Sequence, residues 1–171
     1  IALFLNKNNE IGIIVEREFN GCFINLEAYN LNGENTAYLD ITAKFDNEKR
    51  LFLGAIYCYE KYRNLGIASY LNTLLSYLLK DYIGYIITGF YMPRQMSTDI
   101  NNKISDEQLD IQARRFYRRN GYAIISQEEF LRNPELYNML SKEIDFPLGE
   151  TTSNIKIFKK VESENYDYIN L

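Results

Sequence analysis

The chain has 171 residues, a formal net charge of −4 and no histidine. Its length fits one domain with a core of its own, and its acidic balance argues against broad binding to a nucleic-acid backbone, which needs a surplus of Lys and Arg. Without histidine, a Ser-His-Asp or Cys-His hydrolase is excluded, as are the usual His-containing zinc sites, and no metal site is predicted.

The two cysteines, Cys22 and Cys58, lie far apart in the sequence, each within an apolar run, and form no CxxC pair. We expect two buried, reduced thiols, as in cytoplasmic proteins. A disulfide or a thiol nucleophile is the alternative, although no sequence neighbour would activate Cys58. No apolar stretch reaches the roughly 18–20 residues that cross a membrane, and no secretion signal is visible. The expected location is therefore cytoplasmic, with no membrane partner.

The first third of the chain predicts strands. Apolar and β-branched runs alternate with turn-prone pieces such as Asn6-Lys7-Asn8-Asn9, which indicates a meander of antiparallel strands. The expected strands cover residues 1–6, 11–19, 22–29, 37–45 and 51–59, with a hairpin turn at 46–49 between the last two.

The hydrophobic period changes after the fifth strand. Apolar side chains recur at helical spacing from Ile67 to Leu79, which predicts an amphipathic helix over residues 67–80. A short buried strand at 85–91 and a polar loop at 92–105 follow. Ser105-Asp106-Glu107-Gln108 is typical of a helix start, so we expect a second helix from there to about Asn120, ended by Gly121.

The last part of the chain predicts a strand at 123–126, a short helix at 134–143 with Pro134 at its start, a closing strand at 152–161 and an acidic, loose tail at 162–171. There are no internal repeats. The order of elements predicts an α+β fold around one mixed sheet, in a single domain over residues 1–161.

The stretch Tyr62-Arg63-Asn64-Leu65-Gly66-Ile67-Ala68 joins the fifth strand to the first helix. At a helix start the backbone N–H groups lack intrahelical acceptors and the dipole is positive, which suits an anionic phosphate. The turn therefore predicts a cradle for the pyrophosphate of a nucleotide-like cofactor. The alternative is an ordinary strand-to-helix connection with a surface arginine.

A second segment, Ala113-Arg114-Arg115-Phe116-Tyr117-Arg118-Arg119-Asn120-Gly121-Tyr122, ends the second predicted helix. The first stretch resembles the Arg/Gln-x-x-Gly-x-Gly/Ala pyrophosphate loop of the GNAT N-acetyltransferase superfamily, and the second resembles that family's later Ala-x-x-Phe/Leu-Tyr-x-x-x-Gly-Phe/Tyr segment. The resemblance covers residues 51–126. It implies a GNAT-like, largely antiparallel mixed sheet of about six or seven strands flanked by helices, with acetyl-CoA as the acyl-donor co-substrate.

The resemblance also implies roles for the cofactor residues. The strand at 56–58 would present backbone groups to the pantetheine arm, the turn would hold the pyrophosphate, and Arg63 would add a permanent cation. The implied cofactor-binding residues are Ile56, Tyr57, Cys58, Arg63, Asn64, Leu65, Gly66, Ile67, Ala68 and Ser69.

For catalysis, the resemblance implies that Tyr117 protonates the departing CoA thiolate, and a phenol with a pKa near 10 is a suitable donor. The alternative is that Tyr117 simply continues the apolar face of its helix with Phe116. Glu60 is the candidate base for the amine, with a solvated loop carboxylate as the alternative. Further candidates for the lining of the acceptor pocket are Tyr57, Tyr59, Thr88, Phe90 and Tyr91.

The arginines Arg114, Arg115, Arg118 and Arg119 predict a solvated helix side, from which one side chain contacts the CoA 3′-phosphate or an acidic substrate. Two features depart from the family. Asp110 stands where many members have Asn, which puts one cofactor hydrogen bond in doubt. Only residues 6–10 separate the first two strands, too few for the two helices that usually follow the first strand.

The sequence therefore favours an acetyl-CoA-dependent N-acetyltransferase that acts by direct attack of a primary amine, on a small amine, a polyamine, or a protein lysine or N-terminus. A homodimer is compatible with this interpretation, and a nucleic-acid partner is disfavoured. The alternative is a catalytically inactive GNAT-fold module that binds CoA or another protein. A toxin-type transferase that modifies a macromolecule is a third possibility, which the low pI does not favour.

Overall fold

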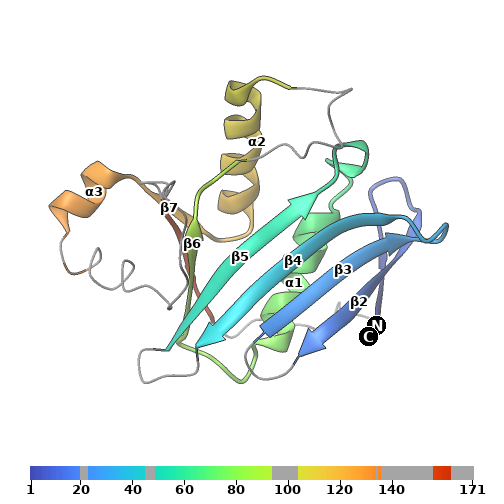
Figure 1. Ribbon diagram of the computed structural model, residues 1–171, viewed down its shortest axis with the longest axis horizontal. Coiled ribbons are helices and arrows are strands. Elements are labelled where there is room, and N and C mark those ends of the chain that lie inside the picture. The colour runs from blue at the N-terminus through green and yellow to red at the C-terminus, as the bar shows by residue number, and fades with distance from the viewer. Residues whose placement is uncertain (20–22, 45–48, 94–103, 134, 136–155, 163–171) are drawn as a thin grey trace.

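The computed structural model describes residues 1–19, 23–44, 49–93, 104–133, 135 and 156–162. Within these ranges, eight strands form one sheet in the order β1-β2-β3-β4-β5-β6-β8-β7 (Figure 1). The sheet has more strands than the six or seven expected. It is otherwise the predicted mixed, largely antiparallel α+β architecture.

The first five strands form the predicted antiparallel meander, because alternating apolar and polar residues give each strand one buried face. The hairpin turn expected at 46–49 falls mostly outside the described residues. The strands are β1 (Ala2–Leu5), β2 (Ile11–Phe19), β3 (Phe23–Asn30), β4 (Asn35–Lys44) and β5 (Arg50–Cys58).

The second half of the chain contributes helices and three further strands. β6 runs parallel to β5, and β8 lies between β6 and β7, antiparallel to both. The elements are the 3₁₀ helix η1 (Glu60–Tyr62), α1 (Ile67–Leu78), β6 (Ile86–Phe90), α2 (Asp106–Arg119), β7 (Ala123–Ile125), α3 (Gln127–Arg132) and β8 (Lys156–Lys160).

The helix α3 was not expected from the sequence, although its start carries a recognisable signal. The Ser126 hydroxyl accepts from the Glu129 N–H (3.4 Å), and the Glu129 carboxylate accepts from the Ser126 N–H (2.8 Å). This reciprocal pair is a capping box, with Glu three residues after Ser. The helix predicted at 134–143 lies almost entirely outside the described residues.

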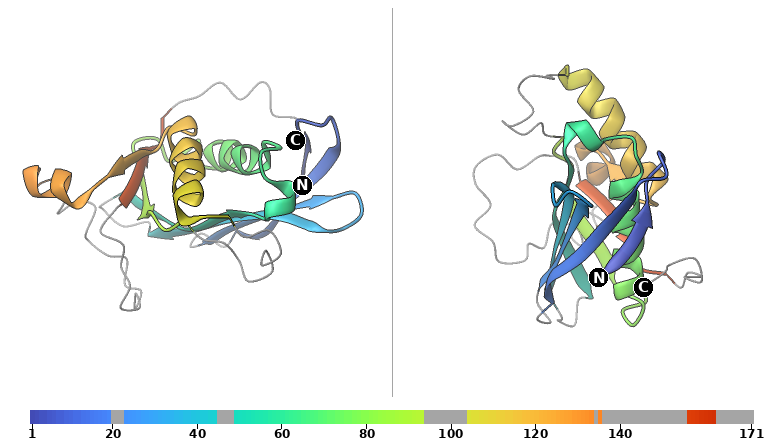
Figure 2. Two further views of the ribbon diagram at one scale, coloured as in Figure 1. Left: turned by 90° about the horizontal axis from the view of Figure 1, so that it is seen from above. Right: turned by 90° about the vertical axis from the view of Figure 1, so that its right-hand side faces the viewer.

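Helices α1 and α2 lie on the same face of the sheet (Figure 2). The core fills the space under α1, where Leu71 and Leu75 are fully buried against Leu26, Leu39 and Ile41 of the central strands. These side chains recur at spacings of four on the helix and two on the strands, the two periods that the sequence pattern had predicted.

No helix in the described part of the chain covers the opposite face of the sheet (Figures 1 and 2). At its β1/β2 edge, Leu3 and Leu5 are each 56% exposed. The connection between β1 and β2 is a tight turn, in which the Asn6 side chain accepts from the N–H groups of Asn8 and Glu10. The prediction that no helix follows the first strand is therefore confirmed.

Cys58 is a half-buried thiol whose Sγ donates to the Tyr62 carbonyl (3.3 Å), and Cys22 lies outside the described residues. None of the helices that the structure describes is both long enough and apolar enough to span a membrane.

Candidate active site

Strands β5 and β6 meet at their N-terminal ends and then separate (Figure 1). They pair only from Arg50 to Phe52 on β5 and from Ile86 to Thr88 on β6. Gly89 lies at the fork, where a Cβ would be only 2.9 Å from the Leu53 carbonyl oxygen, so the close approach requires glycine. Beyond it, the C-terminal half of β5, with Ile56, Tyr57 and Cys58, has no register partner in β6.

The turn predicted as a phosphate cradle follows directly from this half of β5. Gly66 is the N-cap of α1 at φ 85°, a conformation that favours glycine, and the helix has no side-chain cap. The first helical bond runs from the Tyr70 N–H to the Gly66 carbonyl. The N–H groups of Ile67, Ala68 and Ser69 therefore precede the helical ladder and point outward from a positive helix end.

The β1–β2 turn packs on this cradle, a contact that sequence reasoning missed. The Lys7 N–H donates to the Leu65 carbonyl (3.0 Å), and carbons of the Lys7 side chain lie 3.9 Å from the Cβ position at Gly66. Because the two segments are far apart in the chain, no sequence signal indicates the contact. It brings a lysine to the cradle.

The Arg63 side chain folds back onto the end of β5. Its Nε donates to the Cys58 carbonyl (3.0 Å), its Nη2 donates to the Tyr57 hydroxyl (2.9 Å), and its guanidinium carbon lies 5.4 Å from the Tyr57 ring centroid. Arg63 thus fastens the turn to the strand that precedes it, whereas the sequence had suggested only a cation beside the phosphate.

Tyr117 of α2 lies among other rings near the end of β6. Its ring centroid is 5.9 Å from that of Tyr91, 5.3 Å from that of Phe116 and 5.6 Å from that of Tyr122. Burial raises the pKa of the Tyr117 phenol to about 12. Within the described residues no group hydrogen-bonds to its hydroxyl, and at neutral pH the phenol therefore keeps its proton.

Asp110 is engaged by two neighbours. The Tyr91 hydroxyl donates to its carboxylate (2.7 Å), and Arg114 Nε donates to its other oxygen (2.8 Å). The hydrogen bond from Tyr91, followed by that from Arg114, lowers the pKa of this carboxyl. Tyr91 is only 4% exposed, and its hydroxyl ties the end of β6 to α2. Its place in an acceptor lining stays a prediction.

The remaining predicted residues are spread over the end of the sheet. Phe90 packs edge-on against Phe52 (5.8 Å between centroids), and Tyr59 packs edge-on against Tyr57 (5.5 Å). Thr88 is buried in the sheet, between Phe52 and Phe158 in register. Glu60 opens η1, beyond the end of β5.

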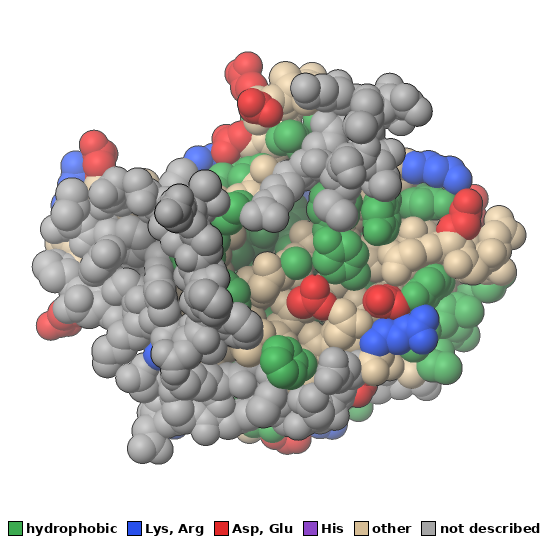
Figure 3. All heavy atoms as spheres, viewed as in Figure 1, with side chains coloured by type: hydrophobic (Ala, Val, Ile, Leu, Met, Phe, Trp, Pro, Cys, Tyr) green, Lys and Arg blue, Asp and Glu red, His purple; other side chains and the backbone are tan. Residues whose placement is uncertain are grey.

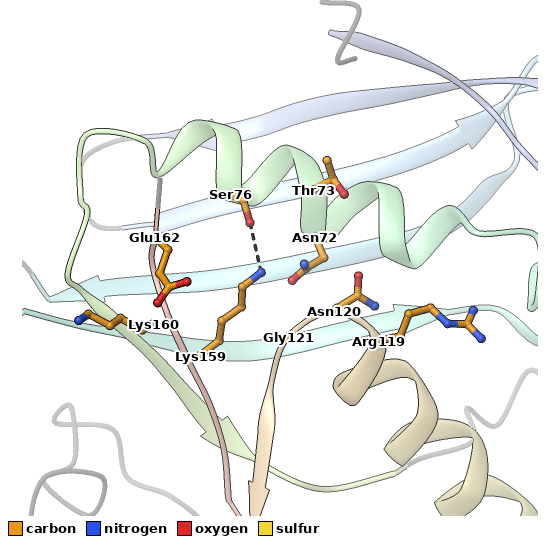
Figure 4. A pocket seen from close by; sticks show the side chains of 9 residues that line it. All are labelled: Asn72, Thr73, Ser76, Arg119, Asn120, Gly121, Lys159, Lys160 and Glu162. Atoms are coloured by element: carbon orange, nitrogen blue, oxygen red, sulfur yellow. Dashed lines mark hydrogen bonds between the residues drawn. The ribbon is translucent and has the colours of Figure 1, made fainter. Parts of the chain in front are cut away.

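A polar pocket of about 400 Å³ lies between α1, the end of α2 and β8 (Figure 4). Lys159 reaches across it toward the Ser76 hydroxyl (3.5 Å), and Asn120 at its rim donates to the Ser69 hydroxyl (3.3 Å) in the first turn of α1. The pocket thus starts beside the cradle. Its lining residues are Asn72, Thr73, Ser76, Arg119, Asn120, Gly121, Lys159, Lys160 and Glu162.

The four arginines of α2 have separate environments. Arg114 is bound to Asp110 and lies over the Tyr91 ring (5.1 Å), Arg119 lines the polar pocket, and Arg115 and Arg118 are exposed.

Solved structures with a similar fold include acetyltransferases. A GNAT-family acetyltransferase from Staphylococcus aureus shares 16% identity at a TM-score of 0.53, over 82% of this chain and 69% of that one. Nourseothricin acetyltransferase shares 14% identity at a TM-score of 0.52, over 82% and 66%. Tetrahymena GCN5 shares 7% identity at a TM-score of 0.50, over 84% and 71%.

No family model and no curated protein sequence matches the chain. The structural likeness nevertheless defines its architecture: the chain has a GNAT-like fold, with the β5/β6 splay and the α1 cradle at one end of its sheet.

Proposed function

We propose that the protein is an acetyl-CoA-dependent N-acetyltransferase. One observation carries the proposal. The uncapped N-terminus of α1, the unpaired half of β5 and the Tyr117 phenol all lie where β5 and β6 end. If the pyrophosphate of acetyl-CoA binds at the N-terminus of α1, its pantetheine arm would lie along the unpaired half of β5. Its thioester would then end near the Tyr117 phenol.

Each part of the donor has a matching part of the chain. The backbone N–H groups of residues 66–69 suit the pyrophosphate, and Lys7 adds a cation above Gly66. The backbone of Ile56, Tyr57 and Cys58 suits the amides of the pantetheine arm. Arg119 and Lys159, in the polar pocket one turn further along α1, suit the 3′-phosphate.

The chemistry needs no covalent enzyme intermediate. The amine nitrogen bonds to the thioester carbonyl carbon while a strand N–H near 56–58 polarises the carbonyl oxygen. The C–S bond then breaks, and the thiolate takes the phenolic proton of Tyr117. The proton that the amine releases leaves through water or Glu60 and restores the phenol.

A second candidate is a CoA-binding module without catalysis. This candidate is favoured by the lack of a nearby base where β5 separates from β6. Residues 53–57 of β5 include no carboxylate, and Glu60 lies beyond the strand in η1. A base for the amine would therefore act through water.

Calorimetric titration with CoA, followed by release of CoA from acetyl-CoA across a panel of primary amines, separates the candidates. We expect binding and amine-dependent release. Absence of CoA binding would refute both candidates, whereas binding without release on any amine would favour the module.

A further inference from the structure

Strand β5 carries a bulge where it passes Asp40 of β4. Asp40 pairs with Ala55 while its neighbour Ile41 pairs with Leu53, so Gly54 and Ala55 together oppose Asp40. A Cβ at Gly54 would lie 3.9 Å from the Asp40 Cβ. Bulges next to active sites re-aim side chains. Here the exposed Gly54 and the small Ala55 place no large side chain beside the carboxylate, and we call this position the dent.

This dent lies where β5 and β6 separate, on the face of the sheet opposite α1. We call this side the uncovered face because no helix within the described residues lies on it. Leu39 and Ile41, on either side of Asp40, are buried in the core on the α1 face, so the Asp40 side chain projects to the other face. Phe52 is the last β5 residue that pairs with β6. The dent at Gly54 therefore begins where the two strands separate.

Aromatic rings stand on both sides of the dent. Tyr57, two residues beyond Ala55, packs against Tyr38 with ring centroids 5.9 Å apart. Phe52, two residues before Gly54, packs against Phe90 at 5.8 Å. Residues two apart on a strand share a face, so both ring pairs flank the carboxylate. Such rings attract cations.

The Asp40 charge has no cationic partner within the described residues. Asn25 donates its side-chain N–H to one Asp40 oxygen and so orients the carboxylate. The next acid on this face, Glu27, already pairs with Arg17 (2.8 Å) and accepts from Tyr29. Figure 3 shows acidic side chains among hydrophobic ones on this face. A cationic ligand would therefore pair with Asp40 without displacing a cation from the described part of the chain.

We propose that Asp40 and its flanking rings bind the acceptor of the transfer as a cationic primary amine that enters from the uncovered face. The inference rests on the proposed function. The donor arm, held from the α1 side, occupies the splay, so a nucleophile reaches the thioester carbonyl from the opposite face. The ammonium gives one proton to water before the neutral nitrogen attacks the carbonyl carbon. As the C–N bond forms and the C–S bond breaks, the thiolate takes the Tyr117 proton, and the second proton that the nitrogen releases returns through water to the Tyr117 phenolate.

The test is a titration of the CoA-bound protein with n-butylammonium, in which binding is monitored by the NMR chemical shifts of the backbone amides. We expect saturable shifts at Asp40, Gly54 and Ala55. Asp40→Asn, which keeps the shape and the contact with Asn25, should weaken this binding about 10- to 100-fold, as expected for loss of a charge-assisted hydrogen bond. Asp81→Asn removes the same charge from an exposed turn and should leave the affinity unchanged.

Gly54→Leu provides a second variant. Its Cβ would meet Asp40 only at ordinary contact distances of 3.7 and 3.9 Å, so the fold is expected to tolerate it while the dent is filled. Butylammonium binding should be lost and the affinity for CoA kept. Intact CoA binding with no saturable shifts at the dent, or with equal amine affinity in Asp40→Asn, would overturn the acceptor site alone. Loss of CoA binding in the unaltered protein would overturn the proposed function instead.

Discussion

The two faces of the sheet differ in what they contribute. The α1/α2 face is filled with fully buried aliphatic side chains and ends in the cradle, the polar pocket and Tyr117. The opposite face carries exposed leucines at one edge and, further along, a carboxylate between aromatic rings. The first face has the features that suit a common donor. The second has those that would select a particular acceptor.

The assignment of the donor to the α1/α2 face is tested most directly by a variant that alters the cradle alone. Gly66→Glu places a side chain at φ 85° and a negative charge where the phosphates would bind. We expect CoA binding to disappear in calorimetry while far-UV circular dichroism stays unchanged. The matched control is Gly33→Glu, at φ 80° in the β3–β4 turn with nothing within 4 Å of its Cβ position. Equal loss in both variants would contradict the assignment of the cradle.

The next largest effect concerns Tyr117. Tyr117→Phe should lower kcat about 10²–10⁴-fold, the usual contribution of a general acid, and leave the affinity for CoA nearly unchanged. Because burial raises the pKa of this phenol to about 12, kcat of the unaltered protein should show no loss from its ionisation at neutral or mildly alkaline pH.

Tyr122→Phe is the control for this variant. Tyr122 is also buried, and its hydroxyl donates to the Asn72 side chain (2.9 Å) rather than lying without a partner. Its loss should cost about 1 kcal/mol of unfolding free energy with kcat largely retained. Normal turnover by Tyr117→Phe would show that another group protonates the thiolate.

The two faces should also differ in stability. Leu75 of α1 is 0% exposed, whereas Leu3 of β1 is 56% exposed on the uncovered face. Leu75→Ala should lower the unfolding free energy by about 2–5 kcal/mol, and Leu3→Ala by less than about 0.5 kcal/mol, as measured by urea denaturation. A large cost at Leu3 would mean that this face is covered after all.

A smaller effect is expected in the polar pocket. Arg119→Gln should weaken CoA binding by about 1 kcal/mol, or roughly fivefold, because the residue is exposed and screened. Dephospho-CoA, which lacks the 3′-phosphate, should bind both forms equally. Arg132→Gln, in the exposed end of α3, serves as the charge control. Equal weakening for both ligands would place the 3′-phosphate elsewhere.

The sequence predicted those parts of the fold that depend on local periodicity. The meander, α1, α2 with its Ser105 cap, and the turn at Gly66 all follow from spacing and capping within a few residues. The turn at Gly66 and the end of α2, to which we assign the donor, could thus be predicted as structure from two short segments.

Contacts between distant segments could not be predicted in this way. Lys7 reaches Leu65 only because β1 and β2 are joined by a tight turn that ends at the cradle. Asp40 faces Gly54 because of a bulge, and a register shift has no signature in either strand alone. The sequence of β6 alone likewise does not show that the Tyr91 hydroxyl bonds to Asp110 of α2.

The smallest predicted effect tests whether Asp110, on the α1/α2 side of the sheet, stabilises the fold through its charge. The pKa of Asp110 is lowered in the folded protein, because its carboxylate bonds to Tyr91 and Arg114. These bonds stabilise the fold fully at pH values above the ordinary Asp pKa of about 3.9. The stabilisation is lost as the pH falls through the lower folded-state pKa. Asp110→Asn should therefore cost less than about 1 kcal/mol at neutral pH, since the pair is partly exposed. The two urea curves should converge in acid. A difference in unfolding free energy that persists below pH 3 would mean that Asp110 acts through shape rather than charge.

Because Tyr91 and Arg114 already occupy both carboxylate oxygens, the Asp110→Asn variant should bind CoA as the unaltered protein does. A gain in CoA affinity would instead assign this position to the donor.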